Sequence, residues 1–132
     1  MFERIGRGVT GDVDRRSRVW RPPTDVYETP AAIVVRVEIA GMREQDFHVE
    51  LVRRRLIISG RREDDTGGTR LAYQQMEIAY GDFRTDVYVP WPVAESAVEA
   101  TYRDGFLVVT LPKASVHRVP VVSAGAELSD KD

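Results

Sequence analysis

The chain has 132 residues, the length of one domain, and at this size it can bury roughly two thirds of the surface that its unfolded form exposes. It has no cysteine, which excludes disulfide bridges, thiol catalysis and thiolate metal sites. The formal net charge is −2 with acidic and basic residues interleaved, so we expect neither nucleic acid nor a membrane surface as a partner. The N-terminal residues lack the apolar core of a signal peptide, and no apolar run approaches the roughly 18 residues of a membrane span. We therefore expect a cytoplasmic protein.

The first 19 residues have the composition of a flexible arm. Apolar residues recur there at roughly helical spacing, namely Phe2, Ile5, Val9 and Val13. Three glycines between residues 6 and 11 interrupt the pattern, and each disfavours a helix by about 1 kcal/mol relative to alanine. We expect a flexible N-terminal arm over residues 1–19.

Residues 22–60 contain four predicted strands. Pro22 and Pro23 enforce an extended approach to a short strand around Val26 and Tyr27. Residues 33–39 alternate, with Val35, Val37 and Ile39 on one face and charged residues on the other, which predicts a strand that is half exposed to water. Residues 47–51 alternate in the same way, and the apolar run 56–60 returns after three arginines, so these two strands form a hairpin.

Residues 61–75 are polar apart from an apolar island at Leu71, Ala72 and Tyr73. A structureless stretch of this length inside a compact domain usually has a function. The alternative is a solvated loop without a partner. A further strand then leads through residues 87–89 to the rigid connector Pro90-Trp91-Pro92.

Residues 98–113 contain the strongest local signal. Asp104 and Gly105 tolerate positive φ and are followed by the β-rich run 106–111, which predicts a hairpin. Leu107, Val109 and Leu111 share one face of its second strand, and Pro112 ends that strand because proline cannot donate to the ladder. Several short strands with little helix between them predict an antiparallel β-sandwich.

The pattern Ala-x-Tyr-x-Asp-Gly-Phe-Leu-x-Val-x-Leu-Pro-Lys in residues 100–113 resembles the signature that closes the α-crystallin domain of small heat-shock proteins. Residues 20–29 resemble the start of that domain, and Glu77-x-x-Tyr80-Gly81-x-Phe83 matches a motif of the bacterial, archaeal and plant branch. The resemblance implies an all-β fold, an antiparallel immunoglobulin-like β-sandwich over residues 20–113. A flexible arm, 1–19, precedes this α-crystallin domain, and a C-terminal extension, 114–132, follows it.

Two positions depart from the family pattern. The turn at residues 53–55 lacks the Gly or Asn that the family usually places there. The family generally has an arginine two residues after the phenylalanine at position 83, in contact with the dimer interface, whereas this chain has Thr85 there with Arg84 beside it. These departures leave the geometry of the turn and of that interface contact open.

The resemblance also implies how subunits assemble. A small strand of the 61–75 loop, here Leu71, Ala72 and Tyr73, pairs with the partner's first strand, here Val26 and Tyr27. The C-terminal anchor, usually Ile-x-Ile, corresponds to Val119, Pro120 and Val121 and docks on a neighbouring subunit. The receiving groove would be lined by Phe47, Val49, Leu51, Val98, Ala100 and Tyr102. Such strand-exchanged dimers would form a large homo-oligomer, for example of 24 subunits.

The anchor has a favourable geometry and small knobs. Val119 and Val121 point the same way in an extended chain, and Pro120 pre-sets that conformation. At about 0.8 kcal/mol per buried methylene, two valines in place of two isoleucines weaken docking by up to about 1.6 kcal/mol per tail. We expect tails that exchange readily; a tail without a docking role is the alternative.

The function that the resemblance implies is that of an ATP-independent molecular chaperone, a holdase that binds partly unfolded client proteins and prevents their aggregation. A flexible apolar arm suits clients of many shapes. The arm residues expected to contact clients are Phe2, Ile5, Val9, Val13, Val19 and Trp20.

We expect no enzyme activity, no cofactor and no metal. His48 and His117 stand alone, without the partners that a catalytic group needs. The acidic run Glu63-Asp64-Asp65 lacks the spacing of a calcium loop, and no phosphate-cradling Gly-x-x-x-x-Gly-Lys occurs. These charged residues are typical of a solvated loop.

Two other functions stay open. One is a β-sandwich co-chaperone or adaptor that binds one folded partner and is a stable monomer, which would leave the anchor and the long loop without a role. The other is nucleic-acid binding through Arg53–Arg55, which we expect near Arg61 and Arg62 across the hairpin, with an affinity that falls steeply with salt. Acidic neighbours and the lack of an aromatic platform favour a solvated turn instead.

Overall fold

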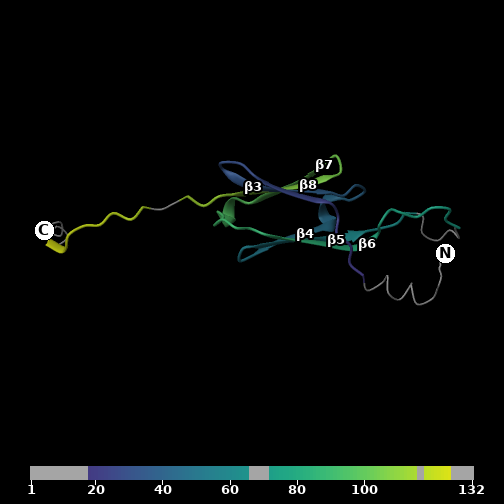
Figure 1. Ribbon diagram of the computed structural model, residues 1–132, viewed down its shortest axis with the longest axis horizontal. Helices are drawn as coiled ribbons and strands as arrows, with labels where there is room; N and C mark the ends of the chain where they lie inside the picture. Colours follow the sequence, from purple (N-terminus) through teal and green to yellow (C-terminus); the bar gives the residue numbers. More distant parts are fainter. Residues whose placement is uncertain (1–17, 66–71, 116–117, 126–132) are drawn as a thin grey trace.

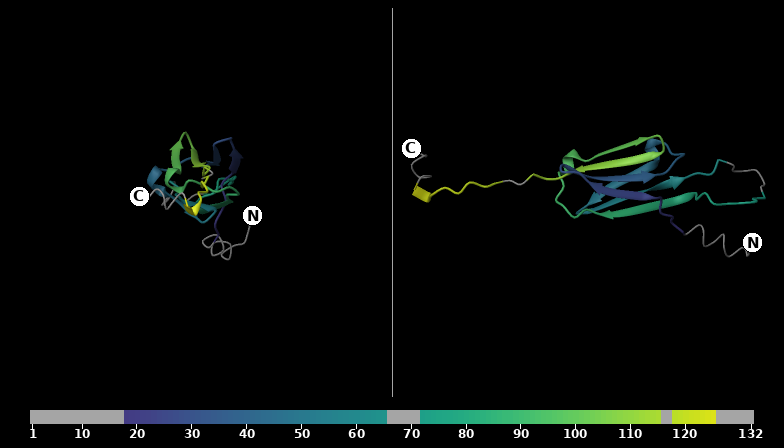
Figure 2. Two further views of the ribbon diagram at one scale, coloured as in Figure 1. Left: turned by 90° about the vertical axis from the view of Figure 1, so that its left-hand side faces the viewer. Right: turned by 45° about the horizontal axis from the view of Figure 1, so that its top comes forward.

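The computed structural model describes residues 18–65, 72–115 and 118–125. Its strands form two antiparallel layers that pack face to face, as the views in Figure 1 and Figure 2 agree in showing. One layer has the order β2 (Thr24–Glu28), β3 (Ala32–Glu38), β8 (Phe106–Pro112), β7 (Glu99–Arg103). The other has the order β4 (Phe47–Val52), β5 (Arg55–Arg62), β6 (Gly81–Tyr88). The all-β sandwich predicted from the sequence is therefore confirmed.

Two connections carry the chain between the layers, and each contains one short 3-10 turn. The turn η1 (Glu44–Asp46) precedes β4, and η2 (Glu95–Ala97) precedes β7. The β7–β8 hairpin is closed by Asp104 and Gly105, whose φ angles of 54° and 84° are both in the left-handed region. This is the pattern of a two-residue turn whose twist matches that of its strands, as the sequence predicted.

The β4–β5 turn holds its shape without glycine. Val52 pairs with Arg55, so Arg53 and Arg54 form the turn, and Arg53 has a φ of 59°, which is costly for a residue with a Cβ. The side chain of Arg54 donates to the carbonyls of Val89, at 3.2 Å, and Pro90. The backbone N–H of Val89 donates in return to the Arg54 carbonyl at 2.7 Å. Tertiary hydrogen bonds thus stabilise a turn whose sequence lacks the usual residues.

The core lies between the layers. Its members are the inward-facing side chains of the central strands and their ends: Ile33, Val35, Val37, Ile39, Leu56, Ile58, Phe83, Val87, Val89, Leu107, Val109 and Leu111. The predicted core faces of β3 and β8 are confirmed. The prediction that the other face of β3 lies in water is wrong for its first half, because Ala32 and Val34 are each only 8% exposed. Strand β3 is central in its layer, so β2 and β8 flank these small side chains.

The two groups of arginines lie apart. Arg55 begins β5, and Arg61 and Arg62 end it, so about 20 Å of strand separates the groups at 3.3 Å per residue. The expectation that Arg53–Arg55 lie near Arg61 and Arg62 is wrong, because the turn lies at the opposite end of β5. Strand β5 also includes residues 61 and 62, so the polar loop begins two residues later than the sequence suggested.

Candidate assembly and binding sites

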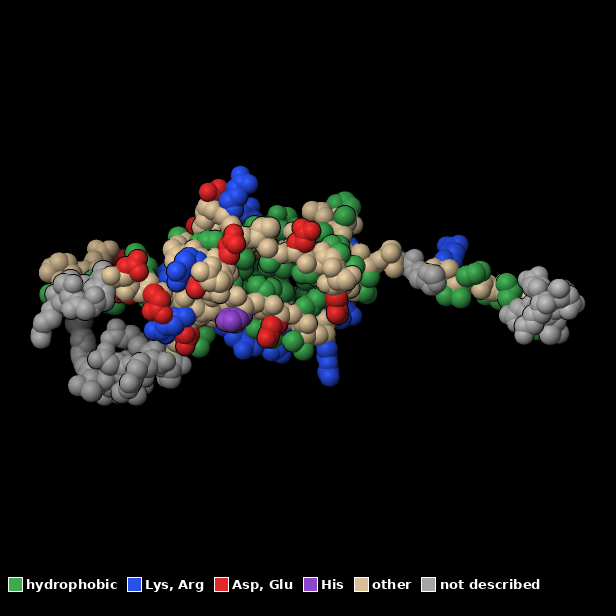
Figure 3. Space-filling model, turned by 180° about the vertical axis from the view of Figure 1, so that it is seen from behind, with side chains coloured by type: hydrophobic (Ala, Val, Ile, Leu, Met, Phe, Trp, Pro, Cys, Tyr) green, Lys and Arg blue, Asp and Glu red, His purple; other side chains and the backbone are tan. Residues whose placement is uncertain are grey.

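A groove opens between β4 and β7, each of which lies at one edge of its layer. Its volume is about 360 Å³, and its lining comprises Glu44, Phe47, Val49, Ala100, Thr101, Tyr102 and Leu107. Each edge strand has a neighbour on one side only, so its inward-facing apolar side chains are incompletely covered. Figure 3 shows hydrophobic side chains in a hollow between the layers.

The structure brings together four of the six residues that the sequence assigned to the groove: Phe47, Val49, Ala100 and Tyr102. The other two, Leu51 and Val98, do not line it and instead pack against the core as partly buried side chains. The sequence missed Glu44, Thr101 and Leu107. Leu107 could have been found, since it pairs with Tyr102 in the register that the Asp-Gly turn sets.

Contacts within the sandwich hold the wall and floor of the groove. Leu107 is only 3% exposed and forms part of the core, so the groove reaches down to the packed interior. The Tyr102 hydroxyl donates to the carbonyl of Ile39 at 2.8 Å and accepts from the N–H of Met42 at 3.4 Å. The Tyr102 and Phe47 rings lie 5.0 Å apart between centres. The apolar surface is therefore formed before any ligand arrives.

The tail carries its two valines in the open. Val119 is 68% exposed and Val121 is 96% exposed, and residues 118–125 stand off from the sandwich (Figure 1). Among the described residues, those that line the groove do not include any of this tail. The chain thus presents both an apolar groove and apolar knobs without joining them.

The root of the tail is fixed to the sandwich at Lys113. Its backbone N–H donates to the carbonyl of Ala31 at 2.9 Å, and its Nζ lies 2.8 Å from a carboxylate oxygen of Glu28 and 5.2 Å from the centre of the Trp91 ring. The hydrogen bond and positive charge of Lys113 lower the pKa of Glu28. The contact ties the tail's root to the end of β2.

The residues assigned to strand exchange lie on exposed surfaces. Val26 and Tyr27 lie on β2, which among the described strands pairs only with β3, so its outer edge is uncovered. Ala72 and Tyr73 are exposed, and Leu71 lies outside the described residues. The described part of the loop carries further exposed apolar residues, Met76, Ile78 and Tyr80. Residues 72–80 form no strand in this single chain, and their pairing with a partner stays a prediction.

The residues assigned to the arm divide into two groups. Phe2, Ile5, Val9 and Val13 lie outside the described residues. Val19 is exposed, whereas Trp20 is half-buried, with its ring centre 5.7 Å from that of Phe83 and its Nε1 donating to the Gly81 carbonyl at 3.3 Å. Trp20 packs on the sandwich because its backbone bridges to β6, which fits its place as the first residue of the predicted domain, and its contact with clients stays a prediction.

Thr85 and Arg84 point to opposite sides of β6. Thr85 is only 1% exposed, and its hydroxyl lies 3.1 Å from that of Thr24, which links β6 to β2. Arg84 faces outward and pairs with Asp86, with its Nε 2.7 Å from a carboxylate oxygen. The hydrogen bond from Arg84 lowers the pKa of Asp86, and it raises the pKa of Arg84 in turn. Arg84 therefore points away from the side that residue 85 faces, and whether it makes the interface contact of the family's arginine stays open.

Most arginines of the two groups on β5 and its turn are engaged. Arg54 is bound to carbonyls as described above, and Arg55 lies 3.4 Å from Asp86. Arg61 pairs with Glu63 at 3.0 Å and with Asp82 at 3.3 Å, and these hydrogen bonds raise its pKa. The carboxylate partners of Arg55 and Arg61 neutralise positive charge, which supports the prediction of a solvated surface over a phosphate-binding one.

Other kinds of site were sought across the described parts of the chain. Within residues 18–65, 72–115 and 118–125, no three His, Cys, Asp or Glu side chains converge so as to hold a metal ion. His48 is exposed on β4, and His117 lies outside the described residues. None of the helices in these ranges is long and apolar enough to cross a membrane.

The similarity to known proteins extends over the sandwich and into the tail. Residues 25–122 match the model of the Hsp20/alpha crystallin family. A probable 15 kDa heat shock protein of Leptospira interrogans is 32% identical over 103 residues, which cover 74% of each chain. Small heat shock protein C2 of Rickettsia felis is 28% identical over 92 residues, and these span 70% of this chain and 60% of that protein's length.

A solved structure agrees in fold. The small heat-shock protein of Xylella fastidiosa superposes with a TM-score of 0.73 at 22% identity, covering 82% of this chain and 99% of that one. The resemblance that the motifs at residues 77–83 and 100–113 suggested is therefore confirmed, and the chain belongs to the Hsp20/alpha crystallin family of small heat-shock proteins.

Proposed function

We propose that this protein is an ATP-independent holdase, which assembles with copies of itself and keeps partly unfolded client proteins from aggregating. The observation that carries the proposal is that one chain holds an apolar groove and, on a separate tail, two exposed valines with the spacing of alternate residues in an extended strand. Membership of the Hsp20/alpha crystallin family supports a chaperone role.

Assembly would join the tail of one subunit to the groove of the next. The tail stands away from its own groove, so docking on a second copy needs no rearrangement of the sandwich. The groove has Glu44 among its lining residues, and Arg118 directly precedes the anchor, so the two surfaces carry opposite charges. Such a head-to-tail contact links dimers into closed assemblies. The uncovered edge of β2 would form the dimer by pairing with residues 71–73 of the partner.

Client binding would use the apolar surface that assembly partly covers. An unfolding client exposes apolar side chains and unpaired strand edges. The groove, the exposed apolar residues of the 72–80 loop and the arm offer several places for such segments without demanding one shape. Heat would free more of this surface by releasing docked tails.

The first experiment is light scattering of a heat-labile client enzyme without ATP, with and without equimolar subunits of this protein. The expected result is suppressed scattering and an assembly mass far above that of a monomer. The variant Ala100→Trp fills the groove at an exposed position, so it should reduce the assembly mass and change the suppression. Tyr88→Trp, a matched change on the outer face of β6, should alter neither.

The result that contradicts the proposal is a stable monomer that leaves scattering unchanged at every temperature below its own unfolding. That outcome would favour the adaptor that binds one folded partner. Binding of nucleic acid with a steep salt dependence would favour the third function.

A further inference from the structure

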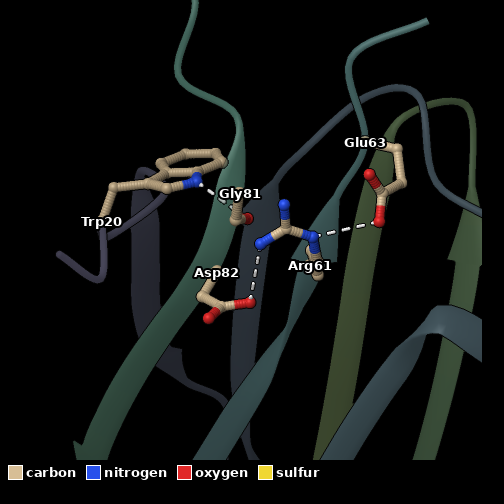
Figure 4. A network of polar contacts seen from close by, with 5 residues as sticks. All are labelled: Trp20, Arg61, Glu63, Gly81 and Asp82. Carbon is tan, nitrogen blue, oxygen red and sulfur yellow. Dashed lines mark hydrogen bonds and ion pairs between the residues drawn. The ribbon is translucent and has the colours of Figure 1, made fainter. Parts of the chain in front are cut away.

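The root of the N-terminal arm is hydrogen-bonded to the start of β6, which directly follows the 72–80 loop. The backbone N–H of Trp20 donates to the Asp82 carbonyl at 3.1 Å, and its carbonyl accepts from the Arg84 N–H at 2.9 Å. Figure 4 shows the indole Nε1 of Trp20 directed at the Gly81 carbonyl, with Arg61 beside it between Asp82 and Glu63. Two segments more than 60 residues apart in sequence thus meet at the start of β6.

The side chain of Arg62, the last residue of β5, binds to both of these segments and to a third. Its Nε and Nη2 donate to the carbonyl of Ala79, the Nε at 3.1 Å, and its Nη1 donates to the carbonyl of Ala40 at 3.1 Å. The guanidinium carbon lies 4.7 Å from the ring centre of Trp20 and 5.3 Å from that of Tyr80. The pairing of Arg62 with Gly81 in the sheet explains why it reaches both segments.

Arginine is the residue that this position needs. Its planar guanidinium presents N–H groups in a fixed fork and can stack on aromatic rings at the same time. A lysine at this position would keep the positive charge but would lose the paired donation to Ala79 and the stacking. The side chain is also half-buried, where cation–π contacts are stronger than at exposed sites.

We propose that Arg62 is a positioning residue that couples the arm to the loop. The root of the arm and the end of the loop are bound to one guanidinium, so displacement of either segment loosens the other. A change of the loop at a subunit contact is thereby transmitted to Trp20, and a pull on the arm is transmitted to the loop. The coupling is a property of the folded chain and goes beyond the proposed function, although its use in client binding rests on that function.

The test is hydrogen exchange of the full-length protein, measured by mass spectrometry on peptides that cover residues 18–22 and 76–84. In Arg62→Ala and in Arg62→Lys, exchange should become at least tenfold faster in both peptides. Arg61→Ala is the matched control, because Arg61 forms exposed ion pairs, which contribute little to stability. It should change neither peptide by more than about twofold. Unchanged exchange in β3 and β8 reports that the sandwich remains folded.

Two results would overturn the proposal: acceleration in only one of the two peptides, or wild-type exchange in Arg62→Lys, which would mean that charge alone suffices. If Arg62→Ala does not fold, Tyr80→Leu removes one aromatic face of the stack at an exposed residue. That variant must then accelerate exchange at residues 18–22, and an unchanged peptide refutes the coupling. No client is present in these measurements, so they test the coupling even if the protein proves not to be a holdase.

Discussion

Removing the two valine knobs of the tail should release the tail from its proposed groove. In the free chain, Val119 and Val121 are 68% and 96% exposed, so docking can bury most of both side chains. Each Val→Ala change removes two methyl-sized groups at about 0.8 kcal/mol each, which gives about 3.2 kcal/mol for the pair. This corresponds to roughly 200-fold weaker docking, since each 1.4 kcal/mol is a factor of ten. Conversely, replacing both valines by isoleucine adds two methylenes and should strengthen docking about fifteenfold.

The assay is subunit exchange between two labelled populations, followed by energy transfer, together with the assembly mass from light scattering. The chain has no cysteine, so Glu95→Cys gives a single exposed labelling site away from the groove. The Val119→Ala/Val121→Ala variant should exchange faster and form smaller assemblies, and the double isoleucine variant should exchange about fifteenfold more slowly. Val122→Ala is the control, because Val122 alternates to the other side of an extended tail. Equal effects of the control and the double alanine variant, or no effect of either, would refute the docking argument.

Three further predictions concern the sandwich. Gly60→Ala should lower the free energy of unfolding by about 1–3 kcal/mol in a urea titration, because the added Cβ would lie 2.5 Å from the Asp46 carbonyl oxygen and 2.7 Å from Cζ of Phe83; unchanged stability would show that the Asp46 backbone and the Phe83 ring both move aside at no cost. Phe83→Ala should cost about 3–5 kcal/mol by the same method, since Phe83 is fully buried in the core, and a loss below about 1 kcal/mol would contradict that packing. Arg84→Gln should raise the pKa of Asp86 toward its usual 3.8, as read from its carboxyl carbon in an NMR titration. Because the folded-state pKa is depressed, the pair stabilises the fold above about pH 3.8, and this contribution is lost as the pH falls through the lower folded-state value; an unshifted titration in the variant would show that Arg84 is not the cause.

The sequence predicted the strands and their faces well, for a local reason. Alternation along residues 47–51 and 106–111 already states which side chains point inward, and the structure confirms this. Asp104 and Gly105 set the register of their hairpin, because a two-residue turn with two positive φ angles leaves one pairing of the flanking strands. The motifs in residues 77–83 and 100–113 led to the family in the same way.

The groove could be predicted only in part. Phe47, Val49, Ala100 and Tyr102 line the groove in the structure, as the alternation placed them, whereas Leu51 and Val98 do not, and the use of this groove by a tail stays a prediction. How far a groove extends between two layers depends on the angle and the spacing at which the layers pack. Neither quantity is written in the period-two pattern of a single strand.

The sequence by itself determined the strand segments, the hairpin turn and the inward faces, since each depends on residues close together in the chain. Only the tertiary structure decided that Val34 is buried, that Arg54 holds a turn without glycine, and that Thr85 faces inward. It also decided that the Trp20 ring packs against Phe83 and that Arg62 binds three separate segments. These contacts join residues that are distant in sequence, and their geometry exists only after the two layers have packed.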